Sequence, residues 1–315
     1  MPQANTTERV LKMKIVPFVD RDWINDHPLG SVLFKHLVQG EPESPDNFMY
    51  ILGRQDGDFL MPRHRHNFDQ IRLPIRGDMN LGRGIVLREG EIGYFAEGLA
   101  YGPQDDPLGN AKPGERIQLV LQFGGASTYG FMSIEQRREA RDELARLGRF
   151  EGNYYYRADG KRAWGLNAIW EHVFGVKLKY PRPRYKDVVI ADPANFHWLP
   201  VRGARSVFRK FMGAFSERAV SIEMFKTERA ATWSSTDTVA RRLLVVLSGS
   251  GTAAGKPLAY LTAVQVDAGE SLEISAATEM ELFVVGLPKV EIPEVESDQY
   301  ESEELADEQI PTHHA

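Results

Sequence analysis

The sequence predicts a mainly β protein built from two β-barrels that are joined by a helical, aromatic-rich connector. Short apolar segments separated by glycine turns recur through the first half of the chain, and the same pattern returns after residue 186. Such spacing is typical of β-sandwiches and barrels. Between the two halves, helical periodicity and a cluster of aromatic residues replace the β pattern. At 315 residues the chain is long enough for two domains, each with its own core.

Four regions follow from this pattern. We expect an N-terminal barrel with a closing helix over residues 1–148, a connector over 149–185, a C-terminal barrel over 186–288 and an acidic tail over 289–315. The tail has nine acidic residues and no Lys or Arg between residues 290 and 310. Without these nine charges the net charge of −6 becomes +3, so the folded body is mildly basic. A segment of this composition is expected to be disordered and solvated.

The first half contains seven expected strands. They cover residues 48–52, 60–66, 70–75, 84–88, 92–96, 99–102 and 116–123. In the last of them polar and apolar residues alternate, so Gln118 and Gln122 lie on one face. That face is either the polar lumen of the barrel or an exposed outer surface.

The connector begins after a well-marked helix. Ser133 followed by Gln136 forms a capping box, and Gly148 is a suitable residue for the end of a helix over 133–147. Residues 165–174 indicate a second, short helix, whereas the prolines within 180–184 exclude one there. The aromatic residues of the connector are expected either to pack between the two barrels or to wall a ligand pocket.

The second half repeats the β pattern without the polar residues of a metal site. Expected strands cover residues 220–226, 242–247, 259–266, 271–275 and 281–286. No histidine occurs between residues 198 and 312. We therefore expect the C-terminal barrel to be structural.

Two histidines in the first half form a candidate metal site. His64 and His66 are two residues apart, so on a strand both imidazole rings point to the same face. Imidazole is a good ligand for divalent metals, and Gln70 could reach the same point from the next strand. The plainer alternative is that each histidine is a hydrogen-bonded core residue.

This spacing resembles the two motifs of the cupin superfamily. In the first motif, His-x-His is followed by Glu and then Gly, and here His64, His66, Gln70 and Gly77 keep the spacing with Gln in place of Glu. The resemblance extends to a second copy after residue 186, so the chain is similar to a bicupin.

The second cupin motif is matched in spacing more than in residue type. Gly90, Ala96, Gly98, Tyr101 and Asp105 keep its positions, but Ala replaces Pro, Tyr replaces the ligand His and Asp replaces Asn. The resemblance implies a divalent metal held by His64, His66, Gln70 and Tyr101, with Fe(II) favoured over Mn, Ni or Zn. Tyr101 would be a ligand, a general acid or base, or a hydroxyl that lines the barrel. The non-ligand roles are favoured because a phenol with a pKa of about 10 is a poor ligand.

Arg72 is a candidate substrate-binding residue. It shares the face of Gln70, so it points into the same barrel, and a buried arginine is costly without an anionic partner. A substrate carboxylate would satisfy it through a bidentate contact, and the alternative is a salt bridge to a distant acid. Gln118 and Gln122 complete the candidate substrate residues. Arg72 and Tyr101 are the candidate catalytic residues.

The resemblance implies a metal-dependent, oxygenase-like enzyme that acts on a small anionic or phenolic organic molecule. The first alternative is a metal-dependent lyase or isomerase that uses Tyr101 as acid or base. The second alternative is a metal-free cupin that binds a ligand or serves as a scaffold.

Composition excludes other classes of function. Cysteine is absent, which excludes disulfides and thiol chemistry and agrees with a cytoplasmic protein. No run of about 18 apolar residues predicts a membrane span, and no basic stripe with interleaved aromatic residues predicts nucleic-acid binding. The expected partner is a small-molecule substrate, and a homodimer is compatible with the sequence.

Overall fold

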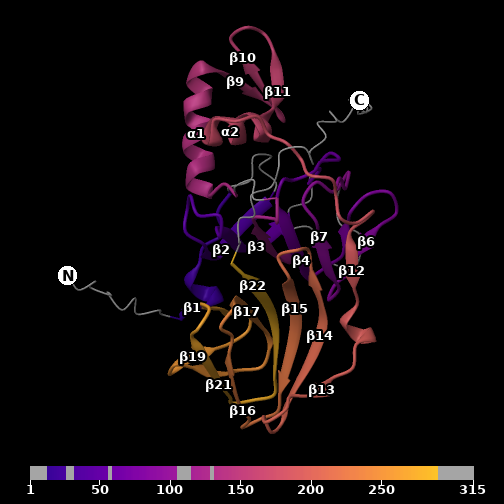
Figure 1. Ribbon diagram of the computed structural model, residues 1–315, viewed down its shortest axis with the longest axis vertical. Helices are drawn as coiled ribbons and strands as arrows, with labels where there is room; N and C mark the ends of the chain where they lie inside the picture. The colour runs from indigo at the N-terminus through magenta and orange to yellow at the C-terminus, as the bar shows by residue number, and fades with distance from the viewer. Residues whose placement is uncertain (1–12, 26–31, 56–58, 105–114, 128–130, 290–315) are drawn as a thin grey trace, which may run out of the picture.

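The computed structural model describes residues 13–25, 32–55, 59–104, 115–127 and 131–289. The predicted acidic tail beyond residue 289 and the predicted motif residue Asp105 lie outside this part of the chain. Figure 1 shows two β-rich halves stacked along the long axis, with a helical lobe at one end.

The N-terminal half contains a six-stranded antiparallel sheet with the order β12-β7-β4-β8-β3-β2. Its strands are β2 (Val32–Gln39), β3 (Phe48–Gln55), β4 (Asp69–Arg76), β7 (Ile92–Phe95), β8 (Arg116–Phe123) and β12 (Val189–Ala191). A separate two-stranded sheet pairs β5 (Met79–Asn80) with β6 (Val86–Leu87). We call this half the N-terminal barrel, although its sheets are open and form a flattened sandwich.

The C-terminal half contains two sheets. The larger has the order β1-β20-β17-β22-β15-β14-β13 and the smaller β16-β21-β18-β19. The larger sheet comprises β1 (Lys14–Val16), β13 (Leu199–Pro200), β14 (Val207–Phe215), β15 (Val220–Thr227), β17 (Ala240–Ser248), β20 (Ala263–Val266) and β22 (Met280–Pro288). The smaller comprises β16 (Thr232–Thr236), β18 (Gly251–Ala253), β19 (Lys256–Leu258) and β21 (Ser271–Ala276). The predicted mainly β fold class with two β-rich halves is confirmed.

Each half contributes one strand to the sheet of the other. The N-terminal strand β1 pairs with β20 in the C-terminal barrel, with Lys14 opposite Gln265. In return β12, which follows the connector, pairs with β7 in the N-terminal barrel. This exchange crosses both of the predicted domain boundaries, at residues 148 and 185. Short 3-10 helices, Phe18–Asp20 and Pro193–Asn195, follow the two exchanged strands.

The largest core lies between the two barrels. Alternating residues of β3 divide between two faces: Phe48, Tyr50 and Leu52 belong to the core shared by both barrels, whereas Met49 and Ile51 face the interior of the N-terminal barrel. In the C-terminal sheet, Leu243 and Val245 face the shared core. The shared core makes the two barrels one packed body.

The interior of the C-terminal barrel is filled with apolar side chains. Leu244, Val246 and Trp233 belong to this second core, together with Val264, Ile274, Leu282 and Val284. The expectation that this barrel is structural stays a prediction.

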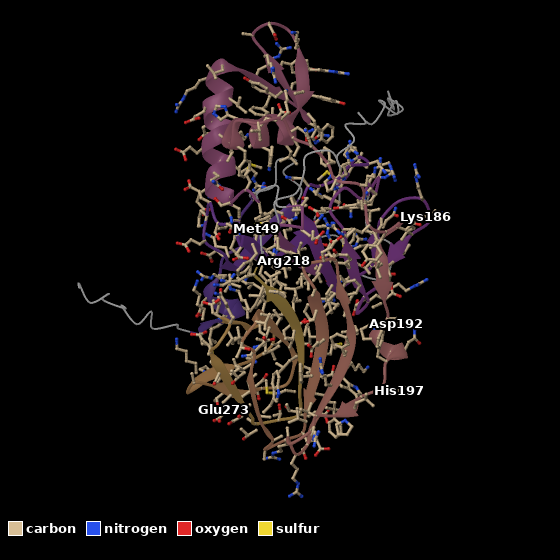
Figure 2. All side chains as sticks on the ribbon, viewed as in Figure 1. Met49, Lys186, Asp192, His197, Arg218 and Glu273 are labelled. Carbon is tan, nitrogen blue, oxygen red and sulfur yellow. The ribbon has the colours of Figure 1, made fainter. Side chains whose placement is uncertain are left out.

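Charged side chains also cross the seam between the barrels. Arg218, placed centrally in Figure 2, donates from Nη2 to Asp46 Oδ1 (3.2 Å) and from Nη1 to the carbonyl of Gly124 (2.5 Å). Its Nε donates to the carbonyl of Pro288 (3.0 Å) at the end of β22. The guanidinium therefore joins segments that are far apart in the sequence.

The helical lobe contains α1 (Ile134–Leu147), α2 (Gly165–Phe174) and a three-stranded sheet of β9 (Gly148–Glu151), β10 (Tyr154–Arg157) and β11 (Arg162–Trp164). Both predicted helices are confirmed, and the Ser133–Gln136 capping box is formed in both directions. Neither helix has the length and apolar character of a membrane-spanning helix, and these are the α-helices of the described residues. The lobe lies at the end of the molecule next to the N-terminal barrel (Figure 1).

Two predicted strands of the metal-site segment are not regular strands. Residues 60–66 and 99–102 pair only through isolated bridges, Met61 with Gln104 and His64 with Tyr101. Pro62 lacks the N–H that a ladder requires, and Gly102 has a φ of 102°, which regular strand geometry does not use. The ribbon is therefore irregular, but the two bridges keep its residues in register.

Candidate active site

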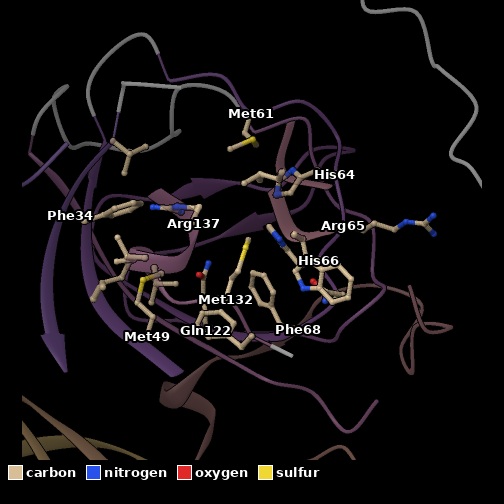
Figure 3. A pocket seen from close by; sticks show the side chains of 18 of the residues that line it. Phe34, Met49, Met61, His64, Arg65, His66, Phe68, Gln122, Met132 and Arg137 are labelled. Atoms are coloured by element: carbon tan, nitrogen blue, oxygen red, sulfur yellow. The ribbon is translucent and has the colours of Figure 1, made fainter. Parts of the chain in front are cut away.

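The N-terminal barrel encloses a cavity of about 170 Å³ between the inner face of its sheet and the helical lobe. The sheet contributes Phe34, Met49, Ile51 and Val120, and the lobe contributes Met132, Arg137, Trp164 and Trp170. Figure 3 shows His64 and His66 on one side of the cavity, with Phe34 and Arg137 across from them. Arg65 points away from it, as expected for a residue between two inward histidines.

The two histidines meet Tyr101 as the motif spacing predicts. The backbone N–H groups of His64 and Tyr101 each donate to the carbonyl of the other residue, both at 3.0 Å. The ring centroids of His64 and His66 are 4.8 Å apart, and those of His64 and Tyr101 are 4.6 Å apart. The His66 ring also stacks on Phe68 at 4.5 Å. The three rings therefore lie next to one another although the segment is not a regular strand.

Local contacts prepare the ring of His64 to be a neutral nitrogen donor. Its Nδ1 lies 2.7 Å from the carbonyl oxygen of Pro62, an acceptor, so Nδ1 carries the hydrogen and Nε2 keeps its lone pair. The side chain is 8% exposed. Burial lowers the pKa of His64 to about 4, and the nearby charges of Arg72 and Arg63 act in the same direction. An imidazole fixed in this way is the form that binds metals.

Gln70 and Tyr101 are held by Arg72. Gln70 Oε1 accepts from Arg72 Nη2 (2.9 Å) and Nε (3.3 Å), and from Gln122 Nε2 (3.1 Å). The hydroxyl oxygen of Tyr101 accepts from Gln70 Nε2 (3.0 Å) and from Arg72 Nη2 (2.9 Å). Burial raises the pKa of Tyr101, so the phenol stays neutral.

This network decides which of the predicted ligands fit a divalent metal. His64 and His66 fit, because their rings are adjacent and line one cavity, and His64 keeps the lone pair of its Nε2. Gln70 and Tyr101 lie beside them as predicted, but their oxygen lone pairs accept hydrogen bonds from a cation, and a second cation at that point would be repelled. Within the described residues no group of three or more His, Cys, Asp or Glu side chains could hold a metal. The donor set that fits is the histidine pair.

Arg72 has neutral partners throughout the described part of the chain. It is 8% exposed, it lines the cavity, and its guanidinium lies 5.0 Å from the ring of Phe95 and 5.4 Å from that of Tyr101. The described residues include no carboxylate that pairs with it. Among the described residues, Arg72 therefore does not form the salt bridge to a distant acid that was the alternative. Its guanidinium instead lines the cavity.

The other predicted substrate residues also face inward. Gln118 and Gln122 line the cavity, so their shared face of the strand is the lumen of the barrel and not its outer surface. Sequence reasoning missed Gln104, which lines the cavity and pairs with Met61. The register could have revealed it, because Gln104 follows Tyr101 on the ribbon opposite the histidines.

The aromatic connector walls the cavity. Trp164, Trp170 and Tyr180 line it from the lobe side, and the guanidinium of Arg65 lies 4.2 Å from the ring centroid of Tyr180. Of the two roles predicted for the connector, these three residues have the second, because they form part of the pocket wall. Tyr185 has the first role. It packs against the core shared by the barrels, and its ring centroid lies 5.7 Å from that of Tyr94.

Comparisons with known proteins place the fold. No protein-family model matches the sequence, and no curated protein does. Among solved structures, a mutant of Bacillus subtilis oxalate decarboxylase OxdC superimposes with a TM-score of 0.53 at 12% identity, over 90% of this chain and 79% of that one. Streptomyces albus HEPD, with 2-hydroxyethylphosphonate and Fe(II) bound, gives 0.52 at 14% identity, over 92% and 78%. The chain has the cupin fold.

A third similar structure is matched over its whole length. Escherichia coli pirin YhhW, in complex with nickel(II), gives a TM-score of 0.50 at 10% identity, over 89% of this chain and 100% of that one. Likeness at these identities concerns the fold, and the metals named belong to those proteins. Within the cupin fold, this chain keeps an open cavity in its N-terminal barrel and an apolar core in its C-terminal barrel.

Proposed function

We propose that the N-terminal barrel is the active site of a metal-dependent, oxygenase-like enzyme that acts on a small anionic organic molecule with an apolar body. The observation that carries this proposal is Arg72, a buried cation with neutral partners that faces the same cavity as the histidine pair. A buried charge of this kind is costly unless a ligand pairs with it.

His64 and His66 would hold the metal, and Fe(II) is our first choice. A divalent ion there would supply Lewis-acid or redox chemistry at its open coordination positions. Because the protein offers two nitrogen ligands, we expect weaker metal retention than in a site with four protein ligands.

The remaining side chains would bind and orient the substrate. Arg72 can hold a carboxylate through its guanidinium, and Gln70 together with Tyr101 fixes the orientation of that guanidinium. The rings of Trp164 and Trp170 would cover the apolar body and exclude water. Tyr101 Oη accepts a hydrogen bond from Arg72 Nη2 (2.9 Å), and burial raises the pKa of the phenol so that it keeps its own proton.

One observation favours each alternative. The neutral phenol of Tyr101 beside the histidines favours a non-redox lyase or isomerase in which Tyr101 is the general acid. The engagement of Gln70 and Tyr101 by Arg72 favours a metal-free binding protein, because it removes two of the ligands that the motif implies.

Elemental analysis separates these possibilities. We would purify the protein without a metal-binding tag, reconstitute it anaerobically with Fe(II), and compare it with the His64→Ala/His66→Ala double variant. We expect a near-stoichiometric ion in the wild type and none in the folded variant. Oxygen uptake with small organic acids then separates an oxygenase from a lyase. Wild-type protein that retains no metal would contradict the metal-dependent proposal and favour the binding protein.

A further inference from the structure

We infer that the connector and the C-terminal barrel control the metal affinity of the histidine pair, and that Arg184 is the positioning residue through which they act. This inference rests on the proposed function, in which His64 and His66 hold the metal. It adds a role for the half of the molecule that has no histidine pair of its own.

The ribbon that carries the histidines is held by a tight turn over residues 96–99. The N–H of Leu99 donates to the carbonyl of Ala96 (3.1 Å), and Gly98, third in the turn, has a φ of 78°. Glycine is favoured at this position because other residues rarely adopt a positive φ. The N–H of Gly98 also donates to the carbonyl of His66 (2.7 Å). The position of the turn therefore helps to determine the position of the His66 backbone.

The second residue of the turn, Glu97, is a fully buried carboxylate. Its Oε1 accepts from the backbone N–H of Ser127 (2.9 Å) and from Arg184 Nη1 (2.7 Å), and its Oε2 accepts from the Ser127 hydroxyl. Its own N–H donates to Asp69 Oδ1 (2.7 Å). Within the described part of the chain, Arg184 is the one cation that pairs with Glu97. Loss of that partner would leave a buried charge uncompensated, which is strongly unfavourable.

Arg184 joins the turn to the C-terminal barrel. It lies in the part of the connector that leads from α2 to β12, and its side chain is 20% exposed. Its Nε donates to Glu217, which lies in the loop between β14 and β15. One guanidinium therefore bridges a carboxylate of the N-terminal barrel and a carboxylate of the C-terminal barrel. A planar group with several N–H donors in fixed directions suits such a bridge.

A backbone contact holds the same turn against the connector. A Cβ added at Gly98 would lie 2.0 Å from the carbonyl oxygen of Pro181, so the two backbones pack directly on each other. Pro181 precedes Arg184 by three residues. The connector thus contacts the turn in two ways, through an ion pair and through close backbone packing. A shift of the connector would displace the turn and, through Gly98, His66.

Position and charge predict opposite effects when Arg184 is removed. If Arg184 acted on the metal through its charge alone, its removal would reduce the repulsion of a divalent ion and raise the affinity. If it acts by holding the turn, its removal lets the turn move, and the His66 imidazole is no longer fixed beside that of His64. Loss of support around metal ligands typically lowers metal affinity about 10–100-fold. The sign of the change therefore separates the two roles.

Anaerobic competition with a chelator, which measures Fe(II) affinity on the folded full-length protein, tests the inference. We expect Arg184→Met to bind Fe(II) about tenfold or more weakly than wild-type protein. Arg184→Lys keeps a positive charge opposite Glu97 and should stay within about threefold of wild type. Arg209→Met is the matched control, because Arg209 pairs with Glu223 inside the C-terminal sheet, and its affinity should be unchanged.

Gly98→Ala tests the backbone contact independently of Arg184. The added methyl group would meet the Pro181 carbonyl, so Fe(II) affinity should again fall by about tenfold. Gly90→Ala is the matched control. Gly90 has a similar φ of 83°, but an added Cβ there has no neighbour within 4 Å. It therefore has the same backbone strain without moving the turn, and its affinity should equal that of wild type.

The outcomes separate this inference from the proposed function. If wild-type protein binds Fe(II) and either Arg184→Met or Gly98→Ala, once folded, binds it as tightly or more tightly, the inference is wrong while the metal site stands. Equal weakening in the control variants would also overturn the inference, since the effect would then be a general loss of stability. If wild-type protein binds no Fe(II), the proposed function fails and the inference fails with it.

Discussion

At the residue scale, the central feature is that Arg72 determines what its neighbours can do. The motif spacing placed Gln70 and Tyr101 beside the histidines, and the structure agrees with that placement. Their chemistry depends on side-chain hydrogen bonds to Arg72, which no spacing predicts. Five of the seven residues singled out from the sequence line one cavity, and the other two, Gln70 and Tyr101, contact it through their hydrogen bonds to Arg72.

Tyr101→Phe should lower stability and leave metal binding intact. The substitution removes the acceptor for Gln70 and Arg72 inside the barrel, and unpaired buried donors cost about 1–3 kcal/mol. Urea unfolding and metal analysis measure the two effects. A variant of unchanged stability that has lost its metal would identify Tyr101 as a ligand instead. If Tyr101 also transfers a proton, turnover should fall by about a hundredfold to ten-thousandfold.

Arg72→Met should affect cation and anion binding in opposite directions. Removal of the guanidinium abolishes a charge that repels a metal at the histidine pair, so affinity for a divalent ion should rise. Arg72→Lys is the control, since it keeps the charge and loses the planar fork. Competition with a metal chelator gives the metal affinity. An Arg72→Met variant with weaker metal binding would show that Arg72 supports the ion.

At the element scale, the helices and several long strands, β8 among them, followed from local signals, whereas β2, β14 and the site segment did not. The capping box and Gly175 (φ 68°) set the ends of α1 and α2, so their bounds agree with the sequence. Strand β8 agrees because its alternation extends over its full length. Strand β14 was missed because Arg209 and Lys210 interrupt its apolar pattern, and it depends on the partner β15.

Ser133→Ala should destabilise the lobe and weaken substrate binding together. Ser133 Oγ accepts from the backbone N–H of Gln136 (3.1 Å), and loss of such a cap costs about 0.5–2 kcal/mol. Because Ser133 and Ile134 also line the cavity, we expect KM to rise more than kcat falls. Ser133→Asp is the matched control, as it retains a capping oxygen. Thermal unfolding and steady-state kinetics measure the change. An unaltered KM in Ser133→Ala would show that the lobe does not contribute to substrate binding.

At the scale of the whole molecule, the two barrels depend on each other through a shared core and exchanged strands. Sequence periodicity predicted two β-rich halves, because each strand carries its own alternation. It could not predict that β1 and β12 cross between them, since pairing partners are set by the folded sheets. The cavity likewise results from the lobe lying over the N-terminal barrel.

Acid groups in the seam should make stability depend on pH. Asp69 is fully buried and accepts from Tyr94 Oη (3.0 Å) and Glu97 N (2.7 Å). Burial, aided by the nearby Glu97 carboxylate, raises the pKa of Asp69 to about 7 from 3.8. Because this pKa is higher in the folded than in the unfolded state, protonation of Asp69 stabilises the folded protein. The stabilisation is fully present below about pH 3.8 and is lost as the pH rises through about 7.

We therefore expect Asp69→Asn to remove a pH-dependent term from the unfolding free energy. Relative to wild type, the variant should gain stability as pH rises from about 4 to 8, because it carries no proton to lose. Urea unfolding at several pH values measures the difference. A difference between the two proteins that stays constant over this range would mean that Asp69 titrates normally.

X-ray absorption spectroscopy of the Fe(II)-reconstituted protein tests the central claim most directly. The account predicts an iron centre whose protein ligands are two imidazole nitrogens, with water completing the coordination, and a spectrum unchanged by Gln70→Leu. A spectrum with phenolate or amide oxygen from the protein, or iron without imidazole, would contradict it.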